Sequence, residues 1–167
     1  MSQPDNIVMS GPNKHALAMH EAARAVLNDT LNPQSKTIKV SIVPSAGALG
    51  FVQFDGAPDR NIKTVANMES RIVALVAGYA AQTVLDAGVA PGAPDSSYEY
   101  ARHLAEEVAD NTVPNWRQVD PQCAQNIVVR CFERAKAMVK DNEQQIRKVC
   151  DALMQKGELT KADLASI

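Results

Sequence analysis

Residues 64–85 form the feature that most restricts how this 167-residue chain can fold. The segment carries apolar side chains on nearly all sides of the helix that it would form, from Ile72 through Val76 and beyond. A helix that is apolar all round is usually buried in the middle of a domain. Its longest apolar run, residues 72–81, is shorter than the roughly 20 residues that a membrane span needs. We therefore expect the rest of the chain to pack around this helix, with no membrane segment.

The composition is that of an ordinary globular domain, 46% hydrophobic and 22% charged with a formal net charge of −2. There is no basic run, and only three Phe, three Tyr and one Trp could stack on bases, so we expect no nucleic-acid partner. The three cysteines are an odd number and widely spaced, which is typical of free thiols in a reducing cytoplasm and predicts a cytoplasmic protein. No phosphate-binding G-x-x-x-x-G-K-[ST] loop is present, so we expect no ATPase domain in this chain.

The spacing of apolar residues predicts a mainly helical α+β fold. Residues 1–13 are expected to be a flexible tail and residues 14–167 a single domain, with a small β-sheet inserted after the first helix and a C-terminal helical bundle. The predicted helices cover residues 14–31, 64–85, 121–139 and 143–156, and a further helix runs from a capping residue among 95–97 to residue 110. The predicted strands cover residues 37–43 and 49–54.

The first predicted helix carries a sequence that departs by one letter from a known metal motif. Residues 20–24 read H-E-A-A-R. In the motif H-E-x-x-H, two histidines on one helix face bind zinc, and the glutamate between them is the general base. Here Arg24 stands at the second histidine position. A guanidinium stays protonated in proteins and has no lone pair for a metal. One ligand of the motif is therefore lost.

Several runs, in the same order and at similar spacing, resemble the peptidase domain of the FtsH family of ATP-dependent zinc metallopeptidases. The resemblance covers the chain from about residue 14 to its end. Residues 18–26 correspond to the family's H-E-A-G-H helix, and residues 39–51 to its strand and A-L-G-[FY] turn. Residues 77–82 correspond to its G-G-R-x-A-E segment, and residues 92–93 precede the helix that carries its third zinc ligand. Residues from 120 onward correspond to its C-terminal helical hairpin. The resemblance implies a zincin-type helical domain.

The resemblance also implies roles for individual residues. His20 corresponds to the first zinc histidine, Glu21 to the general base and Arg24 to the second histidine. The family's zinc-binding aspartate corresponds to Ser97, and Asp95 lies two residues upstream. The glutamate of the G-G-R-x-A-E segment is replaced by Gln82.

The altered ligands predict a vestigial site. Two charges on zinc and one on a guanidinium about 5 Å away repel by about 7 kcal/mol at an effective dielectric constant of about 20. We therefore expect no cofactor. Arg24 follows Glu21 by three residues, so the two side chains can form an ion pair on the helix, and Asp95 could join them.

Three functions remain open. The first is a non-hydrolytic pseudopeptidase that binds a peptide or protein, with Leu49, Gly50, Phe51 and Val52 as a peptide-binding edge. The second is a divergent, active zinc metalloendopeptidase that uses His20, Glu21 and Asp95. The third is a structural or assembly subunit accessory to an ATPase ring, and a homo-oligomer is possible.

Overall fold

The computed structural model describes residues 11–55, 64–91 and 96–167. The described elements form a mainly helical α+β fold with one three-stranded antiparallel sheet, which confirms the predicted fold class. In chain order they are α1 (Gly11–Leu31), β1 (Thr37–Ser41), β2 (Phe51–Phe54), α2 (Val65–Val84), α3 (Ser96–Thr112), α4 (Trp116–Val119), α5 (Cys123–Asp141), α6 (Glu143–Lys156), β3 (Glu158–Thr160) and α7 (Lys161–Ala165).

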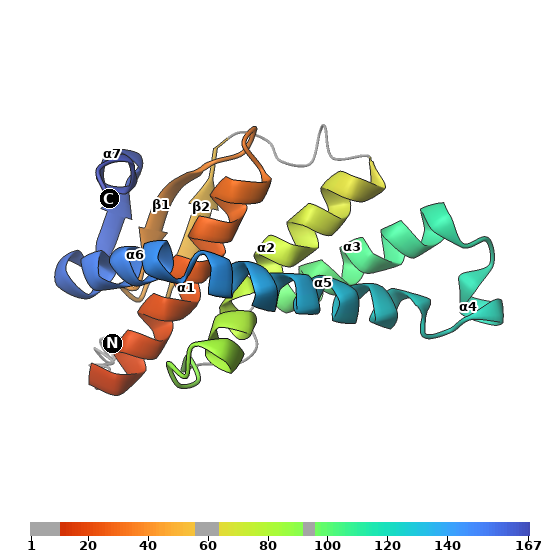
Figure 1. Cartoon of the computed structure of the whole chain (residues 1–167), viewed down its shortest axis with the longest axis horizontal. Coiled ribbons are helices and arrows are strands. Elements are labelled where there is room, and N and C mark those ends of the chain that lie inside the picture. The colour runs from red at the N-terminus through yellow and green to blue at the C-terminus, as the bar shows by residue number, and fades with distance from the viewer. Residues whose placement is uncertain (1–10, 56–63, 92–95) are drawn as a thin grey trace, which may run out of the picture.

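The central position of α2 is also confirmed. This helix packs against α1, α3 and α5, and α5 runs across both α1 and α2 (Figure 1). Its N-terminus is fixed by Thr64, whose side-chain oxygen accepts a hydrogen bond of 3.2 Å from the backbone N–H of Asn67. Such a cap satisfies one of the backbone donors that a helix start leaves without a partner. Most of the residues of α2 from Met68 to Ala81 are buried, as its apolar sequence requires.

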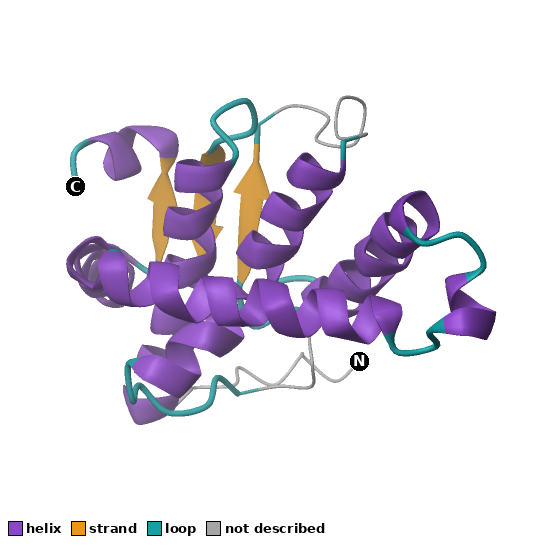
Figure 2. Ribbon diagram, turned by 45° about the vertical axis from the view of Figure 1, so that its right-hand side comes forward, coloured by secondary structure: helices purple, strands orange, loops and turns teal. Residues whose placement is uncertain are grey.

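The sheet has the order β2-β1-β3, with both neighbours antiparallel to β1. Figure 2 shows the strands side by side with helices in front of them, and α1 contacts both β1 and β2. Val40 in β1 pairs with Val52 in β2 and with Leu159 in β3. The two strands β1 and β2 in a small sheet were expected, whereas β3 was not. The chain reaches β3 because Gly157 ends α6 with a φ of 75° and turns it back along β1.

Several predicted bounds were wrong, among them the end of the first strand, which lies at Ser41 rather than at residue 43. The helix α1 begins at Gly11, so residues 11–13 belong to it rather than to the expected tail, whose residues 1–10 lie outside the described ranges. Residues 113–120, for which the sequence had predicted no helix, contain the short helix α4, where the indole N–H of Trp116 donates a hydrogen bond of 2.7 Å to Asp110. The strand predicted from residue 49 begins at Phe51, because a tight turn bridged by Ser45 and Ala48 precedes it.

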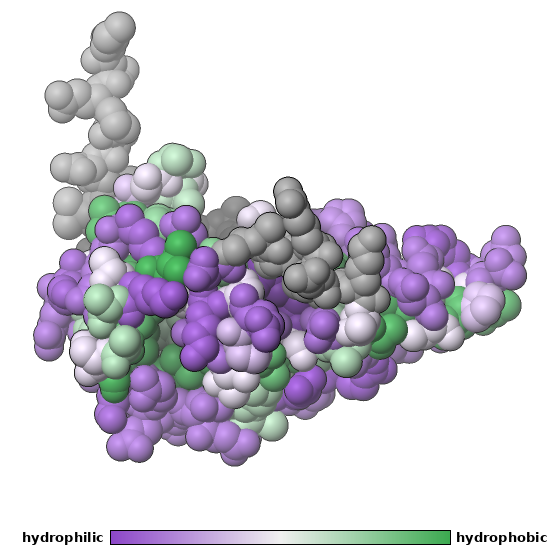
Figure 3. Space-filling view, turned by 90° about the horizontal axis from the view of Figure 1, so that it is seen from above, coloured by the Kyte–Doolittle hydropathy of each residue, from purple (hydrophilic) through white to green (hydrophobic). Residues whose placement is uncertain are grey.

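Other features of the C-terminal half were predicted correctly. The bounds of α6 agree with those expected. A capping box of Thr160 and Asp163 then starts α7. On the face drawn in Figure 3, hydrophobic residues are interspersed with hydrophilic ones. Among the helices that the structure describes, none is long and apolar enough to cross a membrane.

Candidate functional site

The altered motif lines a cleft of about 720 Å³. Its walls come from α1, from the turn between β1 and β2, from α2 and from the first turn of α3. The described residues predicted to form the site lie together here: His20, Glu21, Arg24, Ser97, Leu49, Gly50, Phe51 and Val52 all line the cleft. Asp95, the remaining candidate, lies outside the described residues.

The imidazole of His20 is buried where α1 meets α2. A Cβ atom added to Gly78 would lie 2.4 Å from this ring, so only glycine allows the two helices to approach so closely. The ring of Tyr79 meets the imidazole edge to face, with centroids 5.0 Å apart. The Nδ1 atom of His20 lies 3.1 Å from Nε2 of Gln82. Packing and a hydrogen bond therefore both fix the orientation of the imidazole.

The contact with Gln82 bears on which nitrogen of His20 carries the proton. When the amide nitrogen of Gln82 donates, Nδ1 accepts, and the proton of the neutral imidazole lies on Nε2. A histidine that binds zinc usually donates its second ring N–H to an acceptor, so that the ligating nitrogen keeps its lone pair. With the amide nitrogen as donor, the arrangement is the opposite of the one that a zinc ligand needs.

The carboxylate of Glu21 forms a buried ion pair with Arg24. The Nη1 of Arg24 donates a hydrogen bond of 2.8 Å to Oε2 of Glu21, and the two residues are 8% and 2% exposed. The sequence spacing had predicted this pair. The turn before β2 closes over Glu21, because a Cβ atom on Gly50 would lie 3.3 Å from Oε1 of Glu21 and 2.9 Å from the carbonyl oxygen of Ser41. The carboxylate thus faces a fixed cation in a confined space.

Across the cleft, Ser97 is buried in the first turn of α3. It offers a neutral hydroxyl at the position where the resemblance places an aspartate. A catalytic zinc site takes three protein ligands, drawn from His, Cys, Asp and Glu, and leaves a fourth position for water. Within the ranges that the structure describes, no three such side chains come together. The described donor set therefore does not fit zinc.

The comparison with known families agrees with this site and fold. Residues 7–111, which include the whole of α1, both strands of the hairpin, α2 and most of α3, match the model of Peptidase family M41. The chain belongs to peptidase family M41. The predicted relationship to the FtsH peptidase domain is thereby confirmed.

Individual relatives of this M41 domain are FtsH proteins. It is 23% identical over 166 residues to "ATP-dependent zinc metalloprotease FtsH 2" of Thermoanaerobacter sp., a match that covers 92% of this chain and 32% of the relative. It is 36% identical over 94 residues to "ATP-dependent zinc metalloprotease FTSH 9, chloroplastic" of Arabidopsis thaliana, which covers 52% of this chain and 12% of the relative. The chain thus spans about a third or less of the length of these relatives.

Three contributions to the M41 site were not identified from the sequence. An isolated glycine inside a helix, here Gly78, can signal a close approach of the backbone, but its partner His20 is known only from the fold. Tyr79 lines the cleft and contacts His20, whereas the resemblance included it within residues 77–82 without a role of its own. The segment Val89 to Pro91 also forms part of the cleft wall, and the sequence assigned it no part in the site.

Proposed function

We propose that this M41 domain is a non-hydrolytic member of its family that binds peptide segments in the cleft and does not use zinc. The observation that carries the proposal is the buried ion pair of Glu21 and Arg24. In a zinc peptidase the glutamate of the motif acts as a base toward a metal-bound water. Here the carboxylate is bound instead by a permanent cation from the same helix.

The charge balance of the cleft supports the loss of the metal. Arg24 supplies a positive charge close to where the second zinc ligand would lie, and like charges repel strongly away from bulk water. Ser97 is neutral and cannot offset a second cation. The names of the relatives describe ATP-dependent zinc metalloproteases, but the ligand set of this chain differs from the motif at Arg24 and Ser97.

The position of β2 supports peptide binding. In the described sheet β2 is an edge strand, with β1 on one side only. Residues 49–52 line the cleft beside Glu21. An extended peptide can add to an exposed sheet edge by main-chain hydrogen bonds, which recognise backbone rather than sequence. The side chain of Phe51 adds an apolar contact at this edge.

The metal hypothesis is tested by measuring zinc and casein cleavage on the purified chain, with and without a chelator. We expect no stoichiometric zinc and no chelator-sensitive cleavage. The double variant Arg24→His with Ser97→Asp should gain zinc, whereas the matched variant Arg102→His, at an exposed arginine of α3, should not. Stoichiometric zinc and chelator-sensitive cleavage in the unaltered chain would instead establish the divergent endopeptidase that uses His20, Glu21 and Asp95.

Peptide binding is tested separately with fluorescently labelled, unfolded α-casein. We expect saturable binding that Phe51→Ala weakens, because this ring lines the cleft. Phe132→Ala removes a ring from α5 that does not line the cleft and should leave casein binding unchanged. No binding by the unaltered chain, or equal effects of the two substitutions, would contradict a peptide site at β2. An assembly role alone would then remain.

A further inference from the structure

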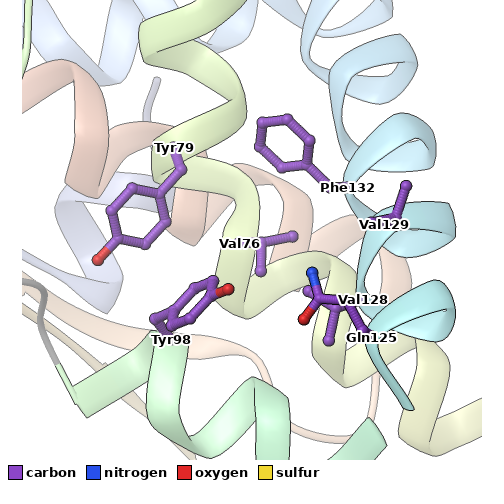
Figure 4. Close-up of a pocket in the computed structure, with 7 residues that line it drawn as sticks. All are labelled: Val76, Tyr79, Tyr98, Gln125, Val128, Val129 and Phe132. Atoms are coloured by element: carbon purple, nitrogen blue, oxygen red, sulfur yellow. The ribbon is translucent and has the colours of Figure 1, made fainter. Parts of the chain in front are cut away.

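A second cavity, of about 420 Å³, lies between α2, α3 and α5. Figure 4 shows its lining side chains arranged around a common space, with Val76 contributed by α2 and Val128, Val129 and Phe132 by α5. These four side chains form an apolar wall. None of the residues predicted to form the metal or peptide site lines this cavity.

The cavity has the composition of a small-molecule site. The described residues that line it include no charged side chain, and their polar groups are the hydroxyls of Tyr79 and Tyr98 and the amide of Gln125. Sites for small molecules have volumes of about 300–1,000 Å³ and are mostly hydrophobic, with a few polar groups that orient the ligand. The absence of charge from this lining favours a neutral ligand, because a buried ion would lack a counter-charge.

A second protein is a poorer occupant. Of the large hydrophobic residues that are exposed in the described chain, only Tyr98 and Val129 belong to this cavity. Val43, Val89 and Val119 lie elsewhere. A stable protein interface buries about 800 Å² on each partner, which two half-exposed side chains cannot supply. The apolar surface is concave and small, as a compact ligand requires.

Tyr79 separates this cavity from the cleft, since its side chain lines both. On one side it meets the ring of His20 at 5.0 Å, and on the other it meets the ring of Tyr98 at 6.2 Å, both edge to face. A molecule in the cavity would therefore contact a ring that packs directly on the motif histidine. Any movement of the Tyr79 ring would therefore change the packing around the imidazole of His20.

We propose that the cavity between α2, α3 and α5 binds a small neutral aromatic molecule with one hydrogen-bonding group, and that its occupancy alters the surroundings of His20 through Tyr79. The aromatic rings of Tyr79, Tyr98 and Phe132 offer faces and edges to a flat ligand. The amide of Gln125 or the hydroxyl of Tyr98 can bind its polar group. The site does not depend on whether the cleft binds peptides.

The test uses indole as the probe and NMR of the whole chain with labelled valine methyl groups. Indole should produce saturable shifts at Val76, Val128 and Val129. Val129→Trp places a ring at the cavity and should weaken indole binding about tenfold or more, because a filled cavity leaves no room for a second group. Val119→Trp, at an exposed valine of α4 outside the cavity, is the matched control and should bind as the unaltered chain does.

A second measurement tests the coupling. Indole should also shift the ring signals of His20. Tyr79→Leu should abolish that shift when the two proteins are compared at indole concentrations that saturate each cavity, as judged from the methyl shifts of Val128. Lack of saturable binding, or equal binding by the Val129→Trp variant, would overturn the site. Binding without any response of His20 would overturn the coupling. A concentration-dependent dimer that Val129→Trp disrupts, and with which indole competes, would show that the occupant is a second copy and would also overturn the proposal.

Discussion

His20 and Arg24 lie one turn apart on the same face of α1, yet different forces determine their surroundings. His20 is positioned by shape: Gly78 allows its ring to touch the backbone of α2, and Tyr79 packs against its edge. Arg24 is positioned by charge, through a buried hydrogen-bonded contact with Glu21. The two positions that the zinc motif assigns to one metal thus have unrelated environments here.

Under the proposed loss of zinc, this difference explains how an M41 domain can keep its fold. The close contact between α1 and α2 depends on Gly78, which leaves room for the ring of His20. The charge that a metal would bring is supplied by Arg24 to the carboxylate of Glu21. If this view is right, breaking the charge contact and breaking the shape contact should have separable effects.

The largest expected effect is that of Arg24→Met, which removes the charge contact but keeps most of the side-chain volume. Glu21 would lose its cationic partner while it remains 2% exposed. Breaking a buried ion pair in this way costs about 3–5 kcal/mol of unfolding free energy. Chemical denaturation measures the loss. The matched substitution Arg102→Met affects an exposed pair with Glu99 and should change the stability little. Similar losses in both variants would mean that burial does not distinguish the two pairs.

Gly78→Ala breaks the shape contact instead. The new Cβ atom would lie 2.4 Å from the ring of His20, and one of the two groups must move. Forcing extra volume into a packed interface costs about 1–3 kcal/mol, partly offset by the better helix propensity of alanine. Denaturation measures the cost, and the ring signals of His20 should shift. Gly11→Ala, where a Cβ atom would meet nothing within 4 Å, is the control and should not reproduce either change.

The sequence predicted those parts of the fold that depend on local patterns. The apolar segment 64–85 correctly indicated a central helix, and the predicted range 143–156 agrees with the bounds of α6. The strand β3 has only three residues, too few for a periodic signal, and forms because β1 offers it a partner. The helix α4 is similarly short and is supported by the contact of Trp116 with Asp110, which no sequence pattern encodes.

The sequence predicted which residues belong to the candidate site but not which of them are in contact. The motif and the resemblance together placed His20, Glu21 and Ser97 in one site, and the structure brings them into one cleft. The contact of Gly78 with His20 depends on how α1 and α2 pack, and the sequence contains no local record of that packing. The cavity on the other side of Tyr79 depends in the same way on three helices.

A smaller effect is expected for Gln82→Glu, which tests the hydrogen bond between Gln82 and His20. A carboxylate can only accept, so Nδ1 of neutral His20 must become the donor and the ring proton should move from Nε2 to Nδ1. Nitrogen-15 NMR of the imidazole distinguishes the two tautomers. Gln118→Glu, in the exposed part of α4, makes the same chemical change far from His20 and should leave its tautomer unchanged. An Nδ1 proton already present in the unaltered chain would contradict the assigned donor.

The smallest effect concerns the ion pair of Lys156 and Asp163, which is more exposed than the pair of Arg24 and Glu21 and serves as its comparison. The pKa of Asp163 is lowered from 3.8 to about 2, chiefly by the hydrogen bond from Lys156 and then by those from Thr160. Because the folded state has the lower pKa, this carboxylate stabilises the fold above about pH 4, and the contribution disappears as the pH falls through about 2. Denaturation between pH 5 and pH 2 should therefore show a shallower decline for Asp163→Asn than for the unaltered chain.

Asp151→Asn, which makes the same change in net charge at an exposed position of α6, should keep the unaltered decline. Added salt sharpens the contrast with the buried pair. Dissolved ions reach and screen exposed charges but penetrate poorly to buried ones. The effect of Asp163→Asn should therefore shrink in 1 M NaCl, whereas that of Arg24→Met should persist. Equal sensitivity to salt would show that solvent reaches the ion pair of Glu21 and Arg24, contrary to its burial.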